Sequence, residues 1–216
     1  MSLFQGRGLS CIRGGRTVFA DLDFDVSDGE VLVLRGPNGS GKSSLLRLMA
    51  GLLRPEMGEI LWDCETLADD PEAHGPRVHY VGHLDAIKPS LTVAENLSIW
   101  AELRTGDLRG VTPALAHMGL DNLAKIPARL LSAGQRRRLA LARITATPAP
   151  LWLLDEPTVA LDAVAVTALE SSIARHRISG GITVVSTHMD LDLDQTKTLQ
   201  LDEYSVDIDA AWGLAS

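Results

Sequence analysis

The 216-residue sequence has two cysteines, few aromatic side chains and no long hydrophobic run. Cys11 and Cys64 lie far apart, which excludes a disulfide scaffold and a CxxC metal site. No stretch of about 18 apolar residues is present, so no segment is expected to cross a bilayer as a helix. The N-terminal segment lacks a positively charged start followed by an apolar run, so we expect no signal peptide.

Positive charge is also scarce: the sequence has 20 basic and 28 acidic side chains, so its formal charge is −8. Contacts to nucleic-acid phosphates need clustered cations, so this balance argues against a general nucleic-acid binder. The hydrophobic content of 45% is ordinary for a globular protein, and the length suffices for one large domain or two small ones. These numbers favour a soluble intracellular protein.

The pattern of apolar residues predicts an α/β fold. Short apolar stretches within the first thirty residues indicate a small antiparallel sheet with tight turns. Residues 30–34 form a continuous apolar run, typical of a strand buried on both faces. Further strands are expected at 151–154, 182–186 and 197–201, with helices over 43–50 and 163–178.

Between these parts, residues 91–145 change in character. Leu and Ala recur at helical spacing there, and Gly and Pro interrupt the pattern. We therefore predict a single domain over 1–216, in which a core of 1–84 and 140–216 carries a helical insert over 85–139.

A glycine-rich segment matches the pattern G-x-x-x-x-G-K-[ST] in full and follows the predicted strand at 30–34. Glycines let backbone N–H groups converge on phosphate oxygens, and the following helix adds the positive end of its dipole. Lys42 is expected to reach the β- and γ-phosphates, and the Ser43 hydroxyl to bind Mg²⁺. The predicted nucleotide-binding residues of this loop are Gly36, Pro37, Asn38, Gly39, Ser40, Gly41, Lys42, Ser43 and Ser44.

Two acidic residues end the apolar strand predicted at 151–154. The carboxyl edge of the sheet should bring Asp155 beside the phosphate loop, where it can hold Mg²⁺ through water. Glu156 can then polarise the water that attacks the γ-phosphate. A strand that ends in two acids is weak evidence alone, but it is strong evidence together with the phosphate loop.

Residues 131–135 read Leu-Ser-Ala-Gly-Gln, and Arg136, Arg137 and Arg138 follow. We interpret the three arginines chiefly as a solvated basic turn of a helix. With these motifs the sequence resembles an ATP-binding cassette (ABC) ATPase, whose signature is usually LSGGQ. The resemblance implies a RecA-like P-loop core with an N-terminal antiparallel β subdomain and a helical insert.

The resemblance also implies how two chains combine. Ser132, Ala133, Gly134 and Gln135 form the signature, in which Ser132 and Gly134 would contact the γ-phosphate of ATP held by a second copy. The start of a helix there would offer N–H groups to an anion. Ala133 adds one methyl group where glycine is usual, and we expect function to be retained.

Other positions correspond to family landmarks, some with departures. Residues 160–162 match the D-loop, and His188 matches the histidine that contacts the γ-phosphate. No aromatic residue occupies the usual adenine-stacking place; Arg13 lies nearest to it, and an exposed turn arginine is an equal alternative. The glutamine of the usual Q-loop is also absent, and His83 could approach Mg²⁺ or the attacking water instead. His79 and His83 lie four apart, but the alternation around them favours a strand over a metal site on a helix.

Phrases around residues 82–97, 131–143 and 150–162 resemble the haem-exporter ATPase of cytochrome c maturation. The resemblance implies a peripheral subunit on the cytoplasmic face of a bacterial inner membrane, with ATP, Mg²⁺, a second copy of itself and integral membrane permease subunits as partners. The insert would receive their coupling helices near His83. The chain has no CxxCH, so partners are expected to handle any haem.

Three other functions are possible alternatives for a sequence with some of these motifs. The same motifs would serve another ABC transporter, such as a metal or amino-acid importer or a drug exporter. A cassette protein acting on ribosomes or DNA usually joins two cassettes or inserts a long coiled coil, and the sequence has neither. A P-loop kinase for small molecules would leave the signature and His188 without a role.

Overall fold

Two β-sheets with helices packed around them form the computed structural model, which describes residues 2–193 and 196–205. The antiparallel sheet has the order β2 (Arg16–Ser27), β1 (Leu3–Arg13), β4 (Met57–Trp62) and β5 (Glu65–Thr66). The parallel sheet has the order β6 (Val78–Val81), β7 (Leu151–Asp155), β8 (Ile182–Ser186), β3 (Val31–Arg35) and β9 (Thr196–Gln200). The predicted α/β class is confirmed.

The first two strands form a hairpin because its two-residue turn, Gly14 and Gly15, has positive φ at both positions. Along β2, apolar residues are buried while the alternating aspartates face outward, which fixes the register of the strand. The antiparallel sheet predicted from the short apolar stretches of the first thirty residues is thus confirmed. They did not reveal β4 and β5, which extend this sheet.

In the parallel sheet, strands β3, β6, β7 and β8 are buried on both faces, whereas the edge strand β9 is mostly exposed. Val31 and Val33 of β3 pack with the helical side of the molecule, whereas Leu32 and Leu34 pack with helix α1 (Lys42–Met49) and the antiparallel sheet. Because successive side chains alternate between faces, a continuous apolar run supplies both cores. The predicted strands at 30–34, 151–154 and 182–186 are confirmed within one residue at each end, and the one predicted at 197–201 is β9.

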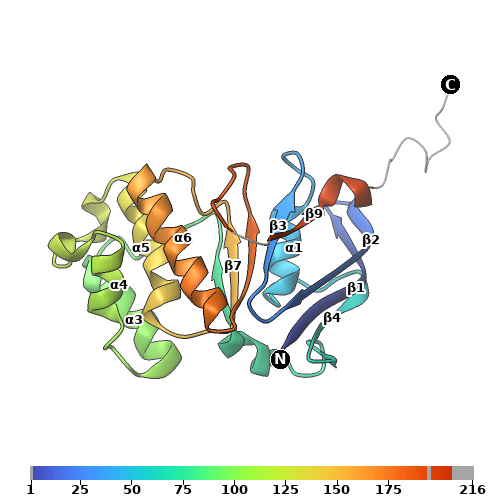
Figure 1. The fold of residues 1–216 in the computed structure, drawn as a ribbon, viewed down its shortest axis with the longest axis horizontal. Helices are drawn as coiled ribbons and strands as arrows, with labels where there is room; N and C mark the ends of the chain where they lie inside the picture. Colours follow the sequence, from blue (N-terminus) through green and yellow to red (C-terminus); the bar gives the residue numbers. More distant parts are fainter. Residues whose placement is uncertain (1, 194–195, 206–216) are drawn as a thin grey trace.

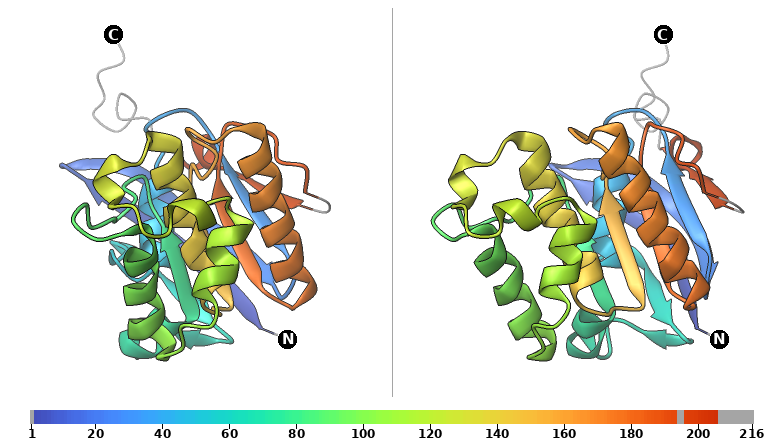
Figure 2. Two further views of the ribbon diagram at one scale, coloured as in Figure 1. Left: turned by 90° about the vertical axis from the view of Figure 1, so that its left-hand side faces the viewer. Right: turned by 60° about the vertical axis from the view of Figure 1, so that its left-hand side comes forward.

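Helices cover the face of the parallel sheet that points away from the antiparallel sheet. The longest are α3 (Val93–Thr105), α5 (Ala133–Ala146) and α6 (Ala163–Ile178), and α4 (Val111–His117) lies between α3 and α5 in the chain. Figures 1 and 2 show these four helices gathered on the side of the sheet away from β1 and β2. Shorter helical turns are α2 (Pro71–His74), 3₁₀ turns at Gly75–Arg77, Asp121–Leu123 and Ala128–Leu130, and a fourth at Leu201–Tyr204.

Local sequence signals set the ends of these helices. Thr92 and Glu95 form a reciprocal capping box at the start of α3, and Gly106 ends that helix with a φ of 67°. The Asp162 side chain accepts a hydrogen bond from the backbone N–H of Ala165 and so caps α6. None of the helices in residues 2–193 and 196–205 is long and apolar enough to cross a membrane.

His79 lies on β6 with its ring in the core, 6% exposed. Its Nε2 atom is 2.9 Å from the carbonyl oxygen of Thr147 and 3.0 Å from the hydroxyl of the same residue. Burial lowers the pKa of His79 to about 3, helped by the positive charge of Arg104. His83 follows the strand and is exposed, so the two histidines lie in different environments.

Acid should therefore weaken the fold through His79. The pKa in the folded state is about 3 and the ordinary value is 6.5, so between these pH values the unfolded chain binds the extra proton. The free energy of unfolding should fall by up to about 1.4 kcal/mol for each pH unit in that window, while the stabilisation is complete above it. Urea unfolding of the native chain and of His79→Gln, which cannot titrate, measures the difference. Equal pH slopes in the two proteins would contradict this prediction.

Candidate active site

A cavity of about 370 Å³ lies where the carboxyl ends of β3 and β7 meet the start of α1. Parallel strands bring their carboxyl ends to one edge of a sheet, and such an edge is a common place for ligands. The cavity brings together most of the residues predicted to bind nucleotide. Its lining is Arg13, Val18, Asn38, Gly39, Gly41, Lys42, Ser43, Ser44, Asp155 and Glu156.

The glycine-rich loop needs its glycines for space as well as for conformation. Gly41 has a φ of 101°, and a Cβ atom there would lie 2.6 Å from the side chain of Val18 and 2.8 Å from that of Phe19. The loop is therefore pressed against the β1–β2 hairpin. Helix α1 begins at the next residue, so its N-terminal end points into the cavity.

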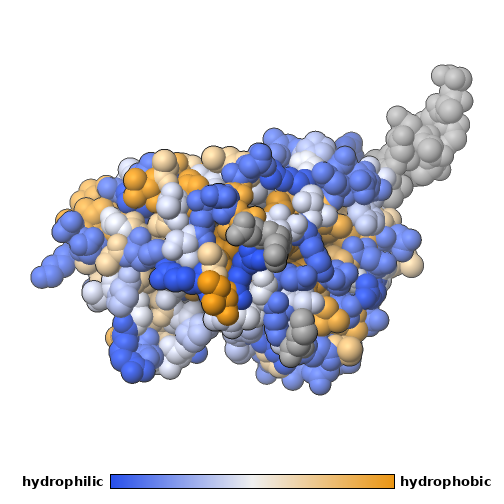
Figure 3. Space-filling view, viewed as in Figure 1, coloured by the Kyte–Doolittle hydropathy of each residue, from blue (hydrophilic) through white to orange (hydrophobic). Residues whose placement is uncertain are grey.

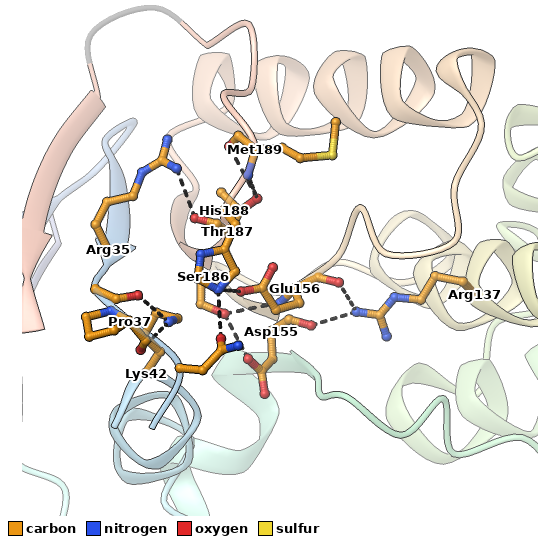
Figure 4. Close-up of polar contacts among 12 residues, drawn as sticks. Arg35, Pro37, Lys42, Arg137, Asp155, Glu156, Ser186, Thr187, His188 and Met189 are labelled. Carbon is orange, nitrogen blue, oxygen red and sulfur yellow. Dashed lines mark hydrogen bonds and ion pairs between the residues drawn. The ribbon is translucent and has the colours of Figure 1, made fainter. Parts of the chain in front are cut away.

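Lys42 follows this loop as the first residue of α1 and is 7% exposed. Its ammonium group donates hydrogen bonds to the carbonyl oxygens of Gly36 at 2.7 Å and Pro37 at 3.0 Å (Figure 4). These neutral acceptors hold the cation without cancelling its charge. The charge is thus placed beside the loop, as the sequence predicts for a phosphate ligand.

Asp155 ends β7 and is 2% exposed. One carboxylate oxygen accepts a hydrogen bond of 2.8 Å from the hydroxyl of Ser186. The other oxygen, Oδ2, is buried and has no hydrogen-bond partner within the described residues. A buried carboxylate oxygen left unpaired is costly, so this atom is available for a further ligand.

Glu156 has a φ of 46°, an uncommon conformation for a residue with a side chain. Its backbone N–H donates to the carbonyl oxygen of Ser186 at 3.0 Å and to the hydroxyl of that residue at 3.1 Å. Its carboxylate lies 3.3 Å from Nε2 of His188 (Figure 4). The same nitrogen is 3.1 Å from Oδ1 of Asn38. The loops after β3, β7 and β8 thus meet at one point.

Arg35 is a residue of this region that the sequence analysis missed. Its guanidinium donates to the carbonyl oxygen of Thr187 at 3.0 Å (Figure 4). It also forms an ion pair of 2.6 Å with Asp190. These contacts brace the segment that carries His188. A single arginine at a strand end gives no signal in the sequence, because both partners lie more than 150 residues further along the chain.

Signature residues lie outside the cavity, at the start of α5. The Ser132 hydroxyl accepts a hydrogen bond from the N–H of Gln135, whose side chain accepts one from the N–H of Ser132, so the predicted helix start is confirmed. Ser132 and Ala133 are exposed. A Cβ atom at Gly134 would lie 2.6 Å from the carbonyl oxygen of Ala160, so only glycine lets the signature pack against residues 160–162.

The interpretation of the following arginines as a solvated turn is wrong for Arg137, which is 5% exposed. Arg136 and Arg138 are half-buried. Arg137 turns inward because carbonyl oxygens at the carboxyl edge of the sheet accept its hydrogen bonds (Figure 4).

The predictions for Arg13, near the adenine, and for His83, in place of the Q-loop glutamine, rest on the weakest sequence signals. Arg13 is exposed and lines the cavity, beside the aliphatic Val18. None of the described residues in that lining is aromatic. His83 is exposed and is not among the lining residues, so its role stays a prediction.

Comparison with known proteins agrees with this geometry. Residues 19–159 match the family described as ABC transporter. The chain is 54% identical to the cytochrome c biogenesis ATP-binding export protein CcmA of Paramagnetospirillum magneticum, over 95% of this chain and 96% of that one. It is also 54% identical to the protein of the same name from Rhodospirillum rubrum, over 99% and 91%. A solved ATP-binding subunit of an ABC transporter is similar with a TM-score of 0.85 and 26% identity, over 98% and 94% of the two chains.

Proposed function

Because the chain belongs to the ABC transporter family, and within it to the CcmA group of cytochrome c biogenesis ATP-binding export proteins, it is an ATP-hydrolysing ABC ATPase; we propose that it drives a haem-exporter complex in the maturation of c-type cytochromes. The observation that carries the proposal is the 54% identity to CcmA proteins over nearly the whole of both chains. Haem itself, if it is moved, is handled by partner subunits.

The phosphate loop and Lys42 bind the phosphates of ATP in this proposal. Residues 38–41 offer backbone N–H groups, and Lys42 exchanges its two carbonyl partners for phosphate oxygens. Arg13 and Val18 flank the place for the base, where the guanidinium plane of Arg13 can stack on it. Ser44 lies beside Lys42 in the lining and adds a hydroxyl.

The residues present fit a magnesium ion bound with the nucleotide. The hydroxyl of Ser43 and the unpaired Oδ2 of Asp155 are hard oxygen donors that face one cavity, and Mg²⁺ prefers such donors. When bound, the ion would neutralise charge on the β- and γ-phosphates. Ser186 holds the other oxygen of Asp155 and so fixes the orientation of the carboxylate.

Glu156 is the proposed general base. Its carboxylate lines the cavity and can accept a proton from the water that attacks the γ-phosphate. His188, 3.3 Å from that carboxylate, holds it in place and can donate to the γ-phosphate. The backbone of Glu156 is held by Ser186 at the sheet edge, so positioning of the carboxylate requires no rearrangement of the core.

A second copy of the chain completes each site in the proposed mechanism. The exposed signature at Ser132 and Ala133 would approach ATP held by the other copy. Val159 and Val164 next to the D-loop are 52% and 80% exposed, an apolar surface that a head-to-tail dimer would bury. ATP binding closes the dimer, and hydrolysis loosens it.

Membrane subunits would contact the helical insert, residues 85–139, which we propose as a subdomain distinct from the core of 1–84 and 140–216. Residues 206–216 of that core lie outside the described residues. Leu84 and Leu103 are 81% and 76% exposed, and between β6 and α3 a small groove is lined by Ile87 and Trp100. Figure 3 shows hydrophobic residues along the upper part of the helical end, with hydrophilic residues below them and further hydrophobic patches elsewhere on that face. The proposed site of action is the cytoplasmic face of a bacterial inner membrane.

Co-purification tests the subfamily directly. The tagged Glu156→Gln chain, extracted from membranes with detergent and ATP, should bring down a membrane protein of the cytochrome c maturation machinery. Cells that lack the chain should lose c-type cytochromes, and the native sequence should restore them while Glu156→Gln should not. Recovery of an importer or drug-exporter permease, with c-type cytochromes unaffected, would contradict the proposal.

A further inference from the structure

Every N–H group of the buried Arg137 guanidinium has an acceptor. Nη2 donates to the carbonyl oxygens of Asp155 at 2.6 Å and Glu156 at 2.9 Å, and Nε donates to that of Pro157 at 3.3 Å. Nη1 donates to the carbonyl oxygen of Gly82 at 2.8 Å and to Oδ1 of Asp85 at 3.2 Å. These contacts account for all five donors of the side chain.

The first set of contacts holds the backbone of the proposed general base. Glu156 has a φ of 46°, and such a conformation persists only where the surroundings impose it. Ser186 binds the N–H side of Glu156, and Arg137 binds the carbonyl side (Figure 4). Loss of either partner would let the carboxylate move relative to the γ-phosphate.

The second set of contacts holds the segment after β6, residues 82–87. This segment contains the exposed Leu84, which we propose faces a membrane partner, and Ala86, which has a φ of 52°. Arg137 itself lies one turn into α5, the helix that begins at the signature. One rigid, planar cation therefore joins the general base, the partner-facing segment and the signature helix.

We propose that Arg137 is a positioning residue that couples the orientation of Glu156 to the conformation of residues 82–87. The inference rests on the proposed role of Glu156. Displacement of residues 82–87 by a partner would pull on the guanidinium, which would change the backbone at Glu156 and thereby the rate of hydrolysis. Lysine cannot replace this arginine, because a single ammonium group has three donors and no planar fork.

Kinetics of the full chain test the coupling. Arg137→Gln and Arg137→Lys should lower kcat at least about tenfold while KM for ATP changes less than about threefold, because misplacement by about 1 Å can cost 100-fold in rate. Asp85→Ala, at the half-buried end of the contact, should lower kcat less, and adding it to Arg137→Gln should cause no further loss. Arg136→Gln is the matched control, because among the described residues its side chain bonds only the carbonyl oxygen of Leu131.

Three results would contradict the proposed coupling. A native kcat in both Arg137 variants, a parallel loss of ATP binding, or multiplicative effects of Asp85→Ala and Arg137→Gln would each show that the guanidinium does not couple the two segments. Glu156→Gln measured beside them separates the two claims. If Glu156→Gln is inactive while the Arg137 variants are native, only the coupling fails; if Glu156→Gln is fully active, the proposed general base fails as well.

Discussion

Glu156→Gln is expected to abolish ATP turnover while ATP binding remains. Glutamine has the shape of glutamate but cannot accept a proton at neutral pH, and loss of a general base typically costs about 100- to 10,000-fold in rate. The backbone contacts of residue 156 with Ser186 and Arg137 do not involve the carboxylate, so the cavity should keep its geometry. Phosphate release and binding of a fluorescent ATP analogue measure the two effects.

The same variant should accumulate as a dimer with ATP. Without hydrolysis the closed state has no route to open, so size-exclusion chromatography should show a dimer that native protein forms only transiently. Ser132→Arg in this background should prevent the dimer, because a bulky cation would occupy the exposed signature. Glu102→Gln, on the exposed face of α3, is the control for a neutralised carboxylate. Turnover at the native rate in Glu156→Gln would contradict the assignment of the base.

The parts of this fold that could be predicted from the sequence are those specified by neighbouring residues. The strand at 30–34 and the glycine loop after it form one local strand–loop–helix unit, whose spacing is imposed by the need to bring N–H groups together. The strands before Asp155 and His188 are short apolar runs, and parallel pairing then brings their ends to one edge. The cavity between β3, β7 and α1 follows from these local signals.

What could not be predicted depends on partners distant in the chain. Strand β4 escaped notice because Met57, Gly58 and Glu59 are all exposed, which leaves half of the strand without an apolar alternation. The charge of Arg137 suggested solvent, yet its acceptors lie 18 to 55 residues away and exist only once the sheet has formed. A buried arginine satisfied by carbonyl oxygens has no pattern in a single sequence.

Lys42→Ala is expected to remove nucleotide binding rather than the chemical step. The charged side chains that line the cavity are Arg13 and Lys42 against Asp155 and Glu156, so they balance in the native chain. Without Lys42, these four positions carry a net charge of −1. That negative charge repels ATP, which is itself an anion. A hydrogen bond to a charged group contributes about 1.5–3 kcal/mol, so the Kd for ATP should rise by about 10- to 100-fold or more.

Calorimetry of ATP binding and thermal unfolding with and without ATP measure the loss, because a ligand raises the unfolding temperature only if it binds the folded state. Native protein should be stabilised by ATP and Lys42→Ala should not, while both unfold at similar temperatures alone, since Lys42 bonds only loop carbonyls that water can satisfy. Lys125→Ala, at an exposed position of the helical insert, removes the same charge far from the cavity and should bind ATP normally. Native affinity in Lys42→Ala would mean that the backbone N–H groups of the loop suffice to hold the phosphates, and the cation would then need another role.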